Sequence, residues 1–257
     1  MPTDWTVLDS FTPVGLEQME AVKLMNRTDT KYLTDTGTLR QVLADAAGCG
    51  YAVLELSGQH LHGYSSMYYD TPELQMYLDH HNRRLVRQKL RTRRYETTGE
   101  TFLELKSKNN HGRTRKKRLQ VSPDQYLMST LQDPTLAAWM EERLVYPRIT
   151  LSPALETCFS RITLVNHGLT ERSTMDIGLR FHNPRRHTSA DLGPLAIIEV
   201  KQDGNLPSLL REILLNHRVK PVRISKYCIG TALTDNEVRA GRFKHKLMLI
   251  NKLMDNA

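Results

Sequence analysis

The sequence predicts an α+β protein, built on an antiparallel β-barrel with helices packed outside it. Several segments alternate charged and apolar residues at a period of two; over 102–108, for example, charged side chains alternate with Leu103 and Leu105. Short turns containing Gly or Asn join neighbouring segments as hairpins. Amphipathic helices need an apolar surface to cover, so the apolar strand faces should point outward and the charged faces should line a closed lumen.

The first third of the chain predicts alternating helices and strands. Apolar residues at helical spacing predict a helix over 13–26, and a strand over 27–33 follows it. Residues 34–36 can cap a second helix, which ends at Ala47 before two glycines. Two strands come next, at 51–56 and 61–69, and residues 71–73 then open a short helix or turn.

The middle of the chain predicts three long strands in succession. The turn segments 97–99 and 109–112 each contain a glycine and join these strands as hairpins. A helical insert is predicted after them, at about 123–145. The three strands are expected at about 84–96, 100–108 and 113–121.

The last third predicts more strands, followed by helices. An amphipathic helix is expected over 206–217, and a basic amphipathic helix at about 235–255 has Phe243 and Ile250 on its apolar side. All elements are expected to form one domain over 1–257. The strands are predicted at about 154–166, 171–182 and 194–202.

Strand 171–182 shows the alternation that defines the two faces of the predicted barrel. Its apolar residues should point outward to the helices, and its polar residues should face the lumen. The outward set is Met175, Ile177, Leu179 and Phe181, and the inward set is Arg172, Thr174, Asp176 and Arg180.

The composition favours an anionic partner, because the net charge is +8 and the pI is about 9.4. Cys49, Cys158 and Cys228 are isolated, which argues against a Cys-based zinc site and is typical of a reducing compartment. The sequence shows no signal-peptide pattern and no apolar run long enough to span a membrane, so a cytoplasmic protein is expected. It contains neither a P-loop nor a dinucleotide-binding glycine motif.

Arg91 and Arg93 are the strongest candidates for an anion site. They lie two apart on one strand face, about 6–7 Å along the strand. Guanidinium groups bind phosphate oxygens through paired hydrogen bonds, so the two arginines could hold neighbouring phosphates. Lys89 extends the row, and Lys106 lies on the next strand. The alternative is a basic surface strand, for example one that contacts RNA.

Glu199 follows an apolar run, and a buried carboxylate usually has a partner. A divalent metal shared with phosphates needs only one or two protein carboxylates, so metal binding is one interpretation. An ion pair with Lys201 or with an arginine is the other. Further along, Arg223, Ser225 and Lys226 precede a short helix whose first N–H groups suit an anion.

Six short motifs of the chain match a known family in type and order. They are RTDTKY from Arg27, LRTRRY from Leu90, FLELK from Phe102, FSR from Phe159, IEVK from Ile198 and SKY from Ser225. In this order they resemble the VTC domain, the catalytic domain of the vacuolar transporter chaperone polyphosphate polymerases. The resemblance covers about 20–235.

The resemblance implies a triphosphate tunnel fold, whose basic lumen holds nucleotide triphosphate and polyphosphate. It implies that Glu199 holds a divalent metal, Mn²⁺ or Mg²⁺. Phe159 stands where a tyrosine is expected, so one hydroxyl contact should be missing. The implied catalytic residues are Arg91, Arg93, Lys106, Arg161 and Lys226; the implied substrate-binding residues are Arg27, Lys31, Lys89, Lys117, Arg172, Lys201, Arg223 and Ser225.

Three functions follow as hypotheses. The favoured one is a polyphosphate polymerase, which transfers the γ-phosphoryl group of ATP to a growing polyphosphate chain. The others are a metal-dependent triphosphatase, with water as the acceptor, and a non-catalytic module that binds polyphosphate or another polyanion. ATP and polyphosphate are the expected partners, and nucleic acid is disfavoured. Because the sequence shows no SPX domain and no membrane segment, a membrane-protein partner would have to supply translocation and any membrane association.

Overall fold

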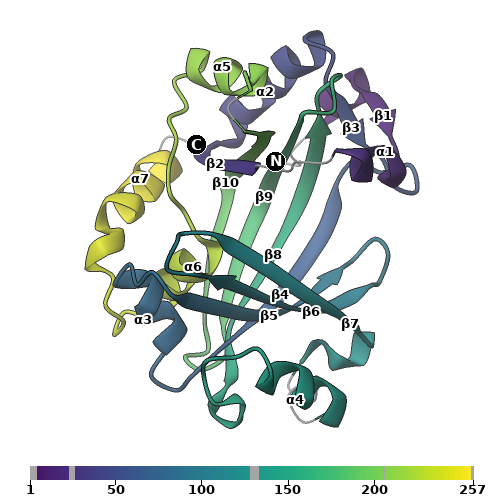
Figure 1. The fold of residues 1–257 in the computed structure, drawn as a ribbon. Helices are drawn as coiled ribbons and strands as arrows, with labels where there is room; N and C mark the ends of the chain where they lie inside the picture. The colour runs from purple at the N-terminus through teal and green to yellow at the C-terminus, as the bar shows by residue number, and fades with distance from the viewer. Residues whose placement is uncertain (1–4, 23–26, 128–132, 205, 256–257) are drawn as a thin grey trace.

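A computed structural model describes residues 5–22, 27–127, 133–204 and 206–255. Its centre is a 10-stranded sheet, whose main path runs β2-β10-β9-β8-β4-β5-β6-β7. Neighbouring strands on this path are antiparallel. The sheet curls, so that β5, β6 and β7 cross in front of β8 (Figure 1). The predicted α+β class and barrel-like antiparallel sheet are confirmed.

The curled sheet is not closed, in contrast to the predicted lumen. Within the described residues, β2 and β7 end the path and do not pair with each other. The free edge of β2 instead faces the segment before α6, where Val222 N donates to the carbonyl of Lys31 (2.7 Å). This segment, together with an isolated bridge between Tyr32 and Pro221, covers the edge of β2.

Nine of the observed strands, β2 to β10, correspond to the predicted ones, with shifted ends; β1 is not among the predicted strands, because residues 13 and 14 are expected to begin a helix. β10 begins earlier than expected, because it continues through an irregularity between Leu192 and Ala196. The bounds are β1 (Thr12–Val14), β2 (Arg27–Asp35), β3 (Ala52–Leu54), β4 (His62–Asp70), β5 (Arg87–Tyr95), β6 (Thr101–Lys108), β7 (Thr114–Val121), β8 (Ser152–Val165), β9 (Glu171–Asn183) and β10 (Thr188–Asp203).

The second helix, α2, spans the predicted residues, whereas the helices predicted over 123–145, 206–217 and 235–255 are shorter than expected. The C-terminal helix begins at Lys244, because Asp235 instead closes a turn by accepting a hydrogen bond from Glu237 N (3.0 Å). In the predicted insert only Pro123–Tyr126, a 3-10 turn, and α4 are helical, and 128–132 lie outside the described residues. The bounds are α1 (Leu16–Ala21), α2 (Thr36–Gly48), α3 (Gln75–His81), α4 (Pro134–Glu141), α5 (Leu209–Asn216), α6 (Lys226–Thr234) and α7 (Lys244–Asp255).

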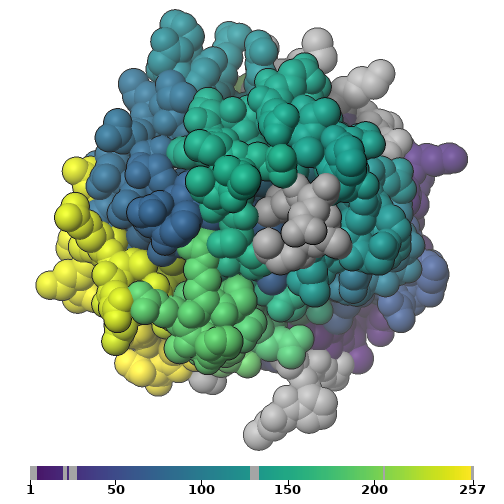
Figure 2. Space-filling view, turned by 90° about the horizontal axis from the view of Figure 1, so that it is seen from below, coloured from purple at the N-terminus to yellow at the C-terminus, as the bar shows by residue number. Residues whose placement is uncertain are grey.

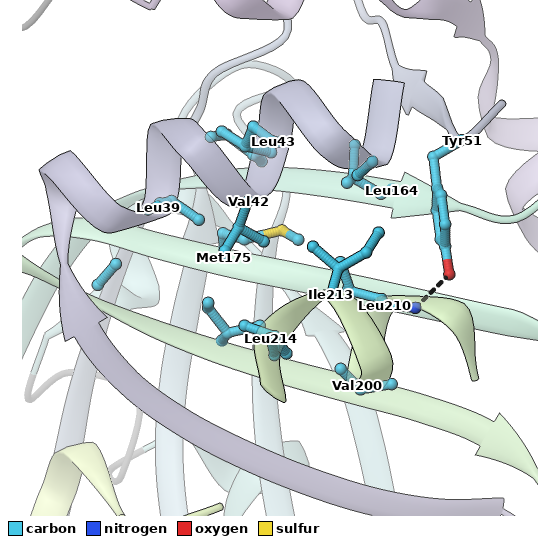
Figure 3. Packing of buried hydrophobic residues seen from close by; sticks show 14 of the residues in the cluster. Leu39, Val42, Leu43, Tyr51, Leu164, Met175, Val200, Leu210, Ile213 and Leu214 are labelled. Atoms are coloured by element: carbon cyan, nitrogen blue, oxygen red, sulfur yellow. Dashed lines mark hydrogen bonds between the residues drawn. The ribbon is translucent and has the colours of Figure 1, made fainter. Parts of the chain in front are cut away.

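The outer face of the sheet is apolar and covered by helices, as predicted. Asp35 caps α2 by accepting a hydrogen bond from Thr38 N (2.7 Å). Figure 3 shows α2 and α5 on the outer face of the sheet, where the hydroxyl of Tyr51 also accepts from Leu210 N (2.9 Å). The buried cluster includes Leu39, Val42, Leu43, Met175, Val200 and Leu214, and a second outer cluster near α4 includes Leu90, Leu103, Leu105 and Met140.

Helix α6 lies on the inner side of the sheet, which the sequence did not indicate. Its residues Tyr227 and Ile229 are buried in one cluster with Leu155, Phe159 and other residues of the concave face. In Figure 1, α6 lies between the strands rather than around them. The helix therefore fills one end of the space that the sheet encloses.

Gly230 lies at a close approach of α6 to the sheet, and Gly230→Ala is expected to destabilise the protein. An added Cβ would lie 2.4 Å from the ring of Phe181 and 2.6 Å from the side chain of Leu155. Overpacking of this kind costs about 1–3 kcal/mol. Thermal unfolding measures the loss, with Gly48→Ala in α2 as the control, because nothing lies within 4 Å of its added Cβ. Equal melting temperatures for the two variants would contradict this close packing.

At Gly178 the side chains of β9 exchange the inner and outer faces of the sheet, so the predicted assignment of side chains to these faces is wrong beyond that residue. Gly178 has φ +60°, and the pairing of β8 with β9 is irregular at the same place, between Cys158 and Ser160. Before it the polar residues face inward as predicted. After it Leu179 and Phe181 turn inward toward α6 and join the cluster there, while Arg180 turns outward.

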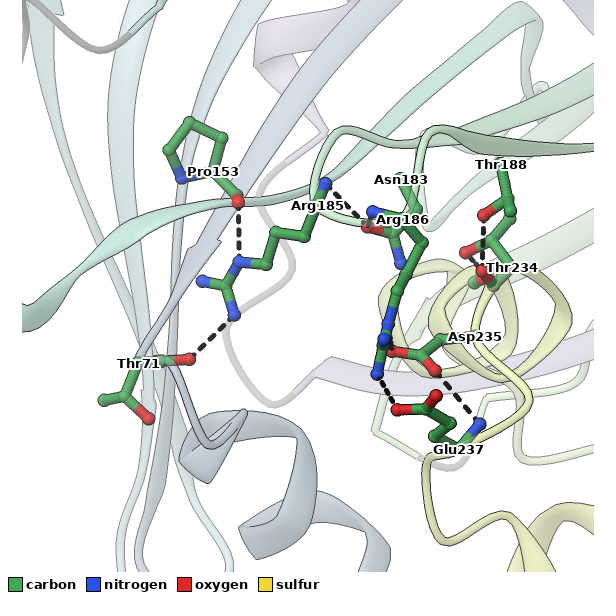
Figure 4. A network of polar contacts seen from close by, with 10 residues as sticks. Thr71, Pro153, Asn183, Arg185, Arg186, Thr188, Thr234, Asp235 and Glu237 are labelled. Atoms are coloured by element: carbon green, nitrogen blue, oxygen red, sulfur yellow. Dashed lines mark hydrogen bonds and ion pairs between the residues drawn. The ribbon is translucent and has the colours of Figure 1, made fainter.

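The β9–β10 hairpin fixes the end of α6 through polar contacts (Figure 4). Arg185 donates to the carbonyls of Pro153 (2.8 Å) and Thr71 (2.9 Å). Arg186 pairs with Asp235, just after α6 (3.0 Å). Seen from below, the hairpin (green) and the C-terminal segment (yellow) lie side by side (Figure 2). The Arg186–Asp235 pair therefore ties the hairpin to the end of α6, and Arg185 ties it to β8 and to the residue after β4.

Within the described residues, no helix combines the length and the hydropathy that crossing a bilayer would require.

Candidate functional site

The register of the strands brings the predicted charged residues onto the inner face. Residues directly opposite each other in an antiparallel pair point to the same side of the sheet. Glu199 of β10 lies opposite Lys31 of β2 on one side and Thr174 of β9 on the other. One step further along, Lys201 lies opposite Arg172. The first wall of the site therefore comes from β2, β10 and β9.

The second wall comes from β5, β6 and β7. Arg91 lies opposite Glu104, and Lys89 lies opposite Lys106. Lys106 in turn lies opposite Lys116 of β7. We call the inward-facing residues of the two walls, together with Arg161 of β8 and the residues at the start of α6, the inner-wall cluster. Its cationic members are Lys31, Lys89, Arg91, Arg93, Lys106, Lys116, Arg161, Arg172, Lys201 and Lys226.

The two walls face each other across the enclosed space. Burial lowers the pKa of Lys31 to about 7, and the positive charges of Lys106, Lys226 and Lys201 contribute to this shift. Burial likewise lowers the pKa of Lys106 to about 8, with contributions from Lys89 and Arg91. Lys31 and Lys106 come from opposite walls, so the site concentrates positive charge in one small volume.

Carboxylates interrupt this positive charge. Asp29 of β2 lies opposite Lys201, and three further carboxylates, Glu199, Glu104 and Asp176, are each paired with two cations. Glu199 pairs with Lys31 and with Lys201 (3.0 Å). Its exposed fraction is 17%, so it can still reach a ligand in the lumen. The other two carboxylates are almost fully buried: Glu104 pairs with Arg91 (2.5 Å) and Lys116, and Asp176 pairs with Arg161 (2.6 Å) and Lys226.

Electrostatics keep the two buried carboxylates ionised. Burial alone would raise the pKa of Asp176, but the charges of Arg161 and Lys226 hold it well below its usual range. Arg161 contacts both oxygens of Asp176, at 2.6 and 2.9 Å, which fixes the plane of its guanidinium group. Glu104 is held ionised in the same way by Arg91 and its neighbours. The acids therefore orient the cations and reduce their mutual repulsion.

The start of α6 adds two predicted residues to the cluster. Ser225 caps the helix by accepting a hydrogen bond from Cys228 N. Its hydroxyl also accepts from the ammonium group of Lys89 on the opposite wall (2.7 Å). Lys226 points to Asp176. The helix that fills one end of the lumen thus also presents cationic and hydroxyl groups to it.

The aromatic ring of Phe159 packs against two cations of the inner-wall cluster. Its ring lies 4.5 Å from the ammonium group of Lys226 and 5.3 Å from the guanidinium carbon of Arg161. It stacks on Tyr64 with a centroid distance of 5.4 Å. Cations are attracted to the face of an aromatic ring, so this pair helps to hold them in place. Because Phe159 has no hydroxyl, unlike the tyrosine expected here, its side chain offers the site an apolar surface.

The structure brings most of the predicted site residues together, but not all of them. Lys117 lies opposite Leu105 of the outer core, and so on the outer face. Lys116 takes the inner position beside Glu104, and the sequence reasoning missed it. Arg223 is exposed, outside the cluster, and the side chain of Arg27 lies outside the described residues. The predicted residues that do meet are Lys31, Lys89, Arg91, Arg93, Lys106, Arg161, Arg172, Glu199, Lys201, Ser225 and Lys226.

The donor set fits a metal that is shared with phosphates. Among the described residues, no three His, Cys, Asp or Glu side chains gather as they would in a site built by protein alone. Glu199 is a single carboxylate on the lumen side, and Mg²⁺ on phosphates typically uses one or two carboxylates and fills its other positions with phosphate and water. The ligand would have to draw Glu199 away from Lys31 or Lys201.

The solved structures that are similar to this chain have low sequence identity to it. A candidate adenylate cyclase from Bacillus halodurans is 15% identical, with a TM-score of 0.50, covering 78% of this chain and 96% of that chain. A candidate adenylyl cyclase from Hippeastrum, described as having a dominant triphosphatase activity, is 16% identical, with a TM-score of 0.48, covering 82% and 97%. At such identities the likeness to the Bacillus protein shows the fold alone, the triphosphate tunnel fold.

A comparison with curated proteins finds no match for this chain. The VTC domain, by contrast, matches it over residues 26–234, which is well over half of its length. This range contains every residue of the inner-wall cluster. The protein therefore belongs to the VTC domain family.

Proposed function

We propose that the protein is a polyphosphate polymerase, which transfers the γ-phosphoryl group of ATP to the end of a polyphosphate chain and releases ADP. The observation that carries this proposal is the inner-wall cluster, whose cations come from both walls and outnumber its acids. Burial, together with the neighbouring cations, lowers the pKa values of Lys31 and Lys106, and an anionic ligand would stabilise their charged forms. A row of such groups suits a chain of phosphates better than a single one.

The residues of the cluster would position the two substrates rather than react with them. Phosphoryl transfer depends on alignment and charge neutralisation more than on covalent chemistry. Arg91 and Arg161, each oriented by a carboxylate, would hold phosphoryl oxygens through their remaining N–H groups. Lys226 and Ser225 would do so from the start of α6. Donor and acceptor would thus be held in line within the lumen.

Glu199 would hold a divalent metal, Mn²⁺ or Mg²⁺, which supplies further neutralisation of phosphate charge when it is bound. The contribution of the chain itself is the carboxylate and its two lysine neighbours. When the carboxylate turns to the metal, its ion pairs with Lys31 and Lys201 would open.

The product formed from ATP tests the proposal against its alternatives. Purified protein is incubated with ATP and Mn²⁺ or Mg²⁺, and the products are separated on a polyphosphate gel. Long chains, with matching release of ADP, are expected. Orthophosphate alone would show a hydrolase with the same lumen, and binding without any turnover would show a polyanion-binding module. Either result would overturn the polymerase proposal.

Tripolyphosphate affinity is expected to fall as the pH rises through about 7 to 8. In the free protein the pKa of Lys31 is about 7 and that of Lys106 about 8, so both lose their charge in this range. A bound polyanion favours the protonated forms, so binding takes up protons and weakens as they become scarce. Calorimetric titration across this range measures the effect. Lys31→Arg, which stays charged, should flatten the pH dependence; an unchanged profile would contradict the assignment to Lys31.

A further inference from the structure

Tyr68 of β4 lies on the inner face between the two walls. It is directly opposite Arg91 of β5 and Leu155 of β8. Its ring stacks on Tyr227 of α6, with a centroid distance of 4.9 Å, and 6% of the residue is exposed. The phenol is therefore fixed in direction by its neighbours.

The hydroxyl of Tyr68 has a partner for its oxygen but none for its proton. The oxygen accepts a hydrogen bond from Nη1 of Arg91 (2.8 Å). Among the residues that the structure describes, no acceptor lies within hydrogen-bonding distance of the hydroxyl proton. A buried donor without an acceptor is costly, and native structures usually satisfy such groups with protein, water or a ligand.

The surroundings of this hydroxyl select an anion as the missing acceptor. Burial alone would raise the pKa of Tyr68, but Arg91, Arg93, Lys89 and Lys226 together lower it. The same four cations belong to the inner-wall cluster, so a phosphoryl oxygen held by them would lie within reach of the phenol. The one carboxylate near Arg91, Glu104, is already occupied by Arg91 and Lys116.

We infer that Tyr68 is a further substrate-binding residue, whose hydroxyl donates to a phosphoryl oxygen in the lumen while Arg91 holds the phenol oxygen in place. This inference rests on the proposed function, because it requires a phosphate chain in the tunnel. It also supplies a hydroxyl on the cationic wall of a chain that has Phe159 where a tyrosine is expected. A phenol bridging an arginine and a phosphate fixes both the position and the angle of the phosphate.

Calorimetric titration with inorganic tripolyphosphate tests the inference on the full chain. Tyr68→Phe keeps the ring that stacks on Tyr227 but removes the donor, and it should bind at least about tenfold more weakly, as is typical for a lost hydrogen bond to a charged group. Tyr77→Phe is the matched control. It removes a hydroxyl from the same aromatic group, one that donates to the carbonyl of Arg239, and should leave affinity within about twofold.

A second measurement separates ligand contact from a structural role. In a spectroscopic titration of tyrosine ionisation, the wild type should show one group that ionises below the usual pH, and Tyr68→Phe should lack it. Tripolyphosphate should move this ionisation to higher pH, because a phenol that donates to phosphate keeps its proton. An ionisation that tripolyphosphate leaves unmoved, or normal binding by Tyr68→Phe, would overturn this inference alone. Failure of the wild type to bind tripolyphosphate would overturn the proposed function with it.

Discussion

Replacement of Glu199 by glutamine is expected to abolish turnover while polyphosphate binding is largely retained. Gln keeps the shape of the side chain but loses the charge that would hold the divalent metal. It also releases Lys31 and Lys201 from their ion pairs, which makes the lumen more positive. Chemistry should therefore fall by about 100-fold or more, which corresponds to about 2.7 kcal/mol of transition-state stabilisation.

The two halves of this expectation need separate measurements. Polymer formation from ATP at saturating Mn²⁺ measures the loss of turnover, and titration with tripolyphosphate measures binding. Glu142→Gln serves as the control, because its carboxylate is 70% exposed and lies outside the inner-wall cluster. Wild-type turnover by Glu199→Gln at saturating metal would exclude Glu199 as the metal ligand. Loss of binding together with turnover would show that the carboxylate mainly shapes the lumen.

Much of the site was predictable, because it depends on strand alternation. A period of two, read along 102–108 or 197–201, assigns each side chain to a face without knowledge of the partner strand. The same reasoning identified Arg91, Arg93 and Glu199. It also bears on the two adjacent lysines of β7. Lys117 shares a face with Leu119 and Val121, which pack in the outer core, so alternation places Lys116 on the inner face, as the register shows.

Two features cannot be found from alternation. A single bulge exchanges the faces of a strand, and Gly178 is one of several glycines that a sequence offers as candidates. The place of α6 inside the curl depends on contacts between distant segments, such as Gly230 with Phe181 and Leu155. The apolar residues of α6 would be equally suitable for a helix packed on the outer face of the sheet. Its short Ser225–Lys226 start carried the only hint, since both residues suit an anion.

Replacement of Asp176 by asparagine is expected to cause the largest loss of stability at the site. Asp176 is 4% exposed and pairs with Arg161 and Lys226, each of which is 15% exposed. Removal of the charge leaves two cations in the lumen without their counterion, and breaking such a buried pair costs about 3–5 kcal/mol. Thermal or urea unfolding measures the loss, with Asp9→Asn on the exposed surface as the control.

Tripolyphosphate should restore more stability to Asp176→Asn than it adds to the wild type. A bound polyanion can take the place of the missing carboxylate beside Arg161 and Lys226, so the variant should bind it more tightly. At a given ligand concentration, tighter binding stabilises the folded state more, with the logarithm of the affinity. Equal gains for variant and wild type would show that the ligand does not reach these cations. A larger gain would place the phosphate chain against Arg161 and Lys226, and the orienting carboxylate would then be a counterion that the substrate replaces.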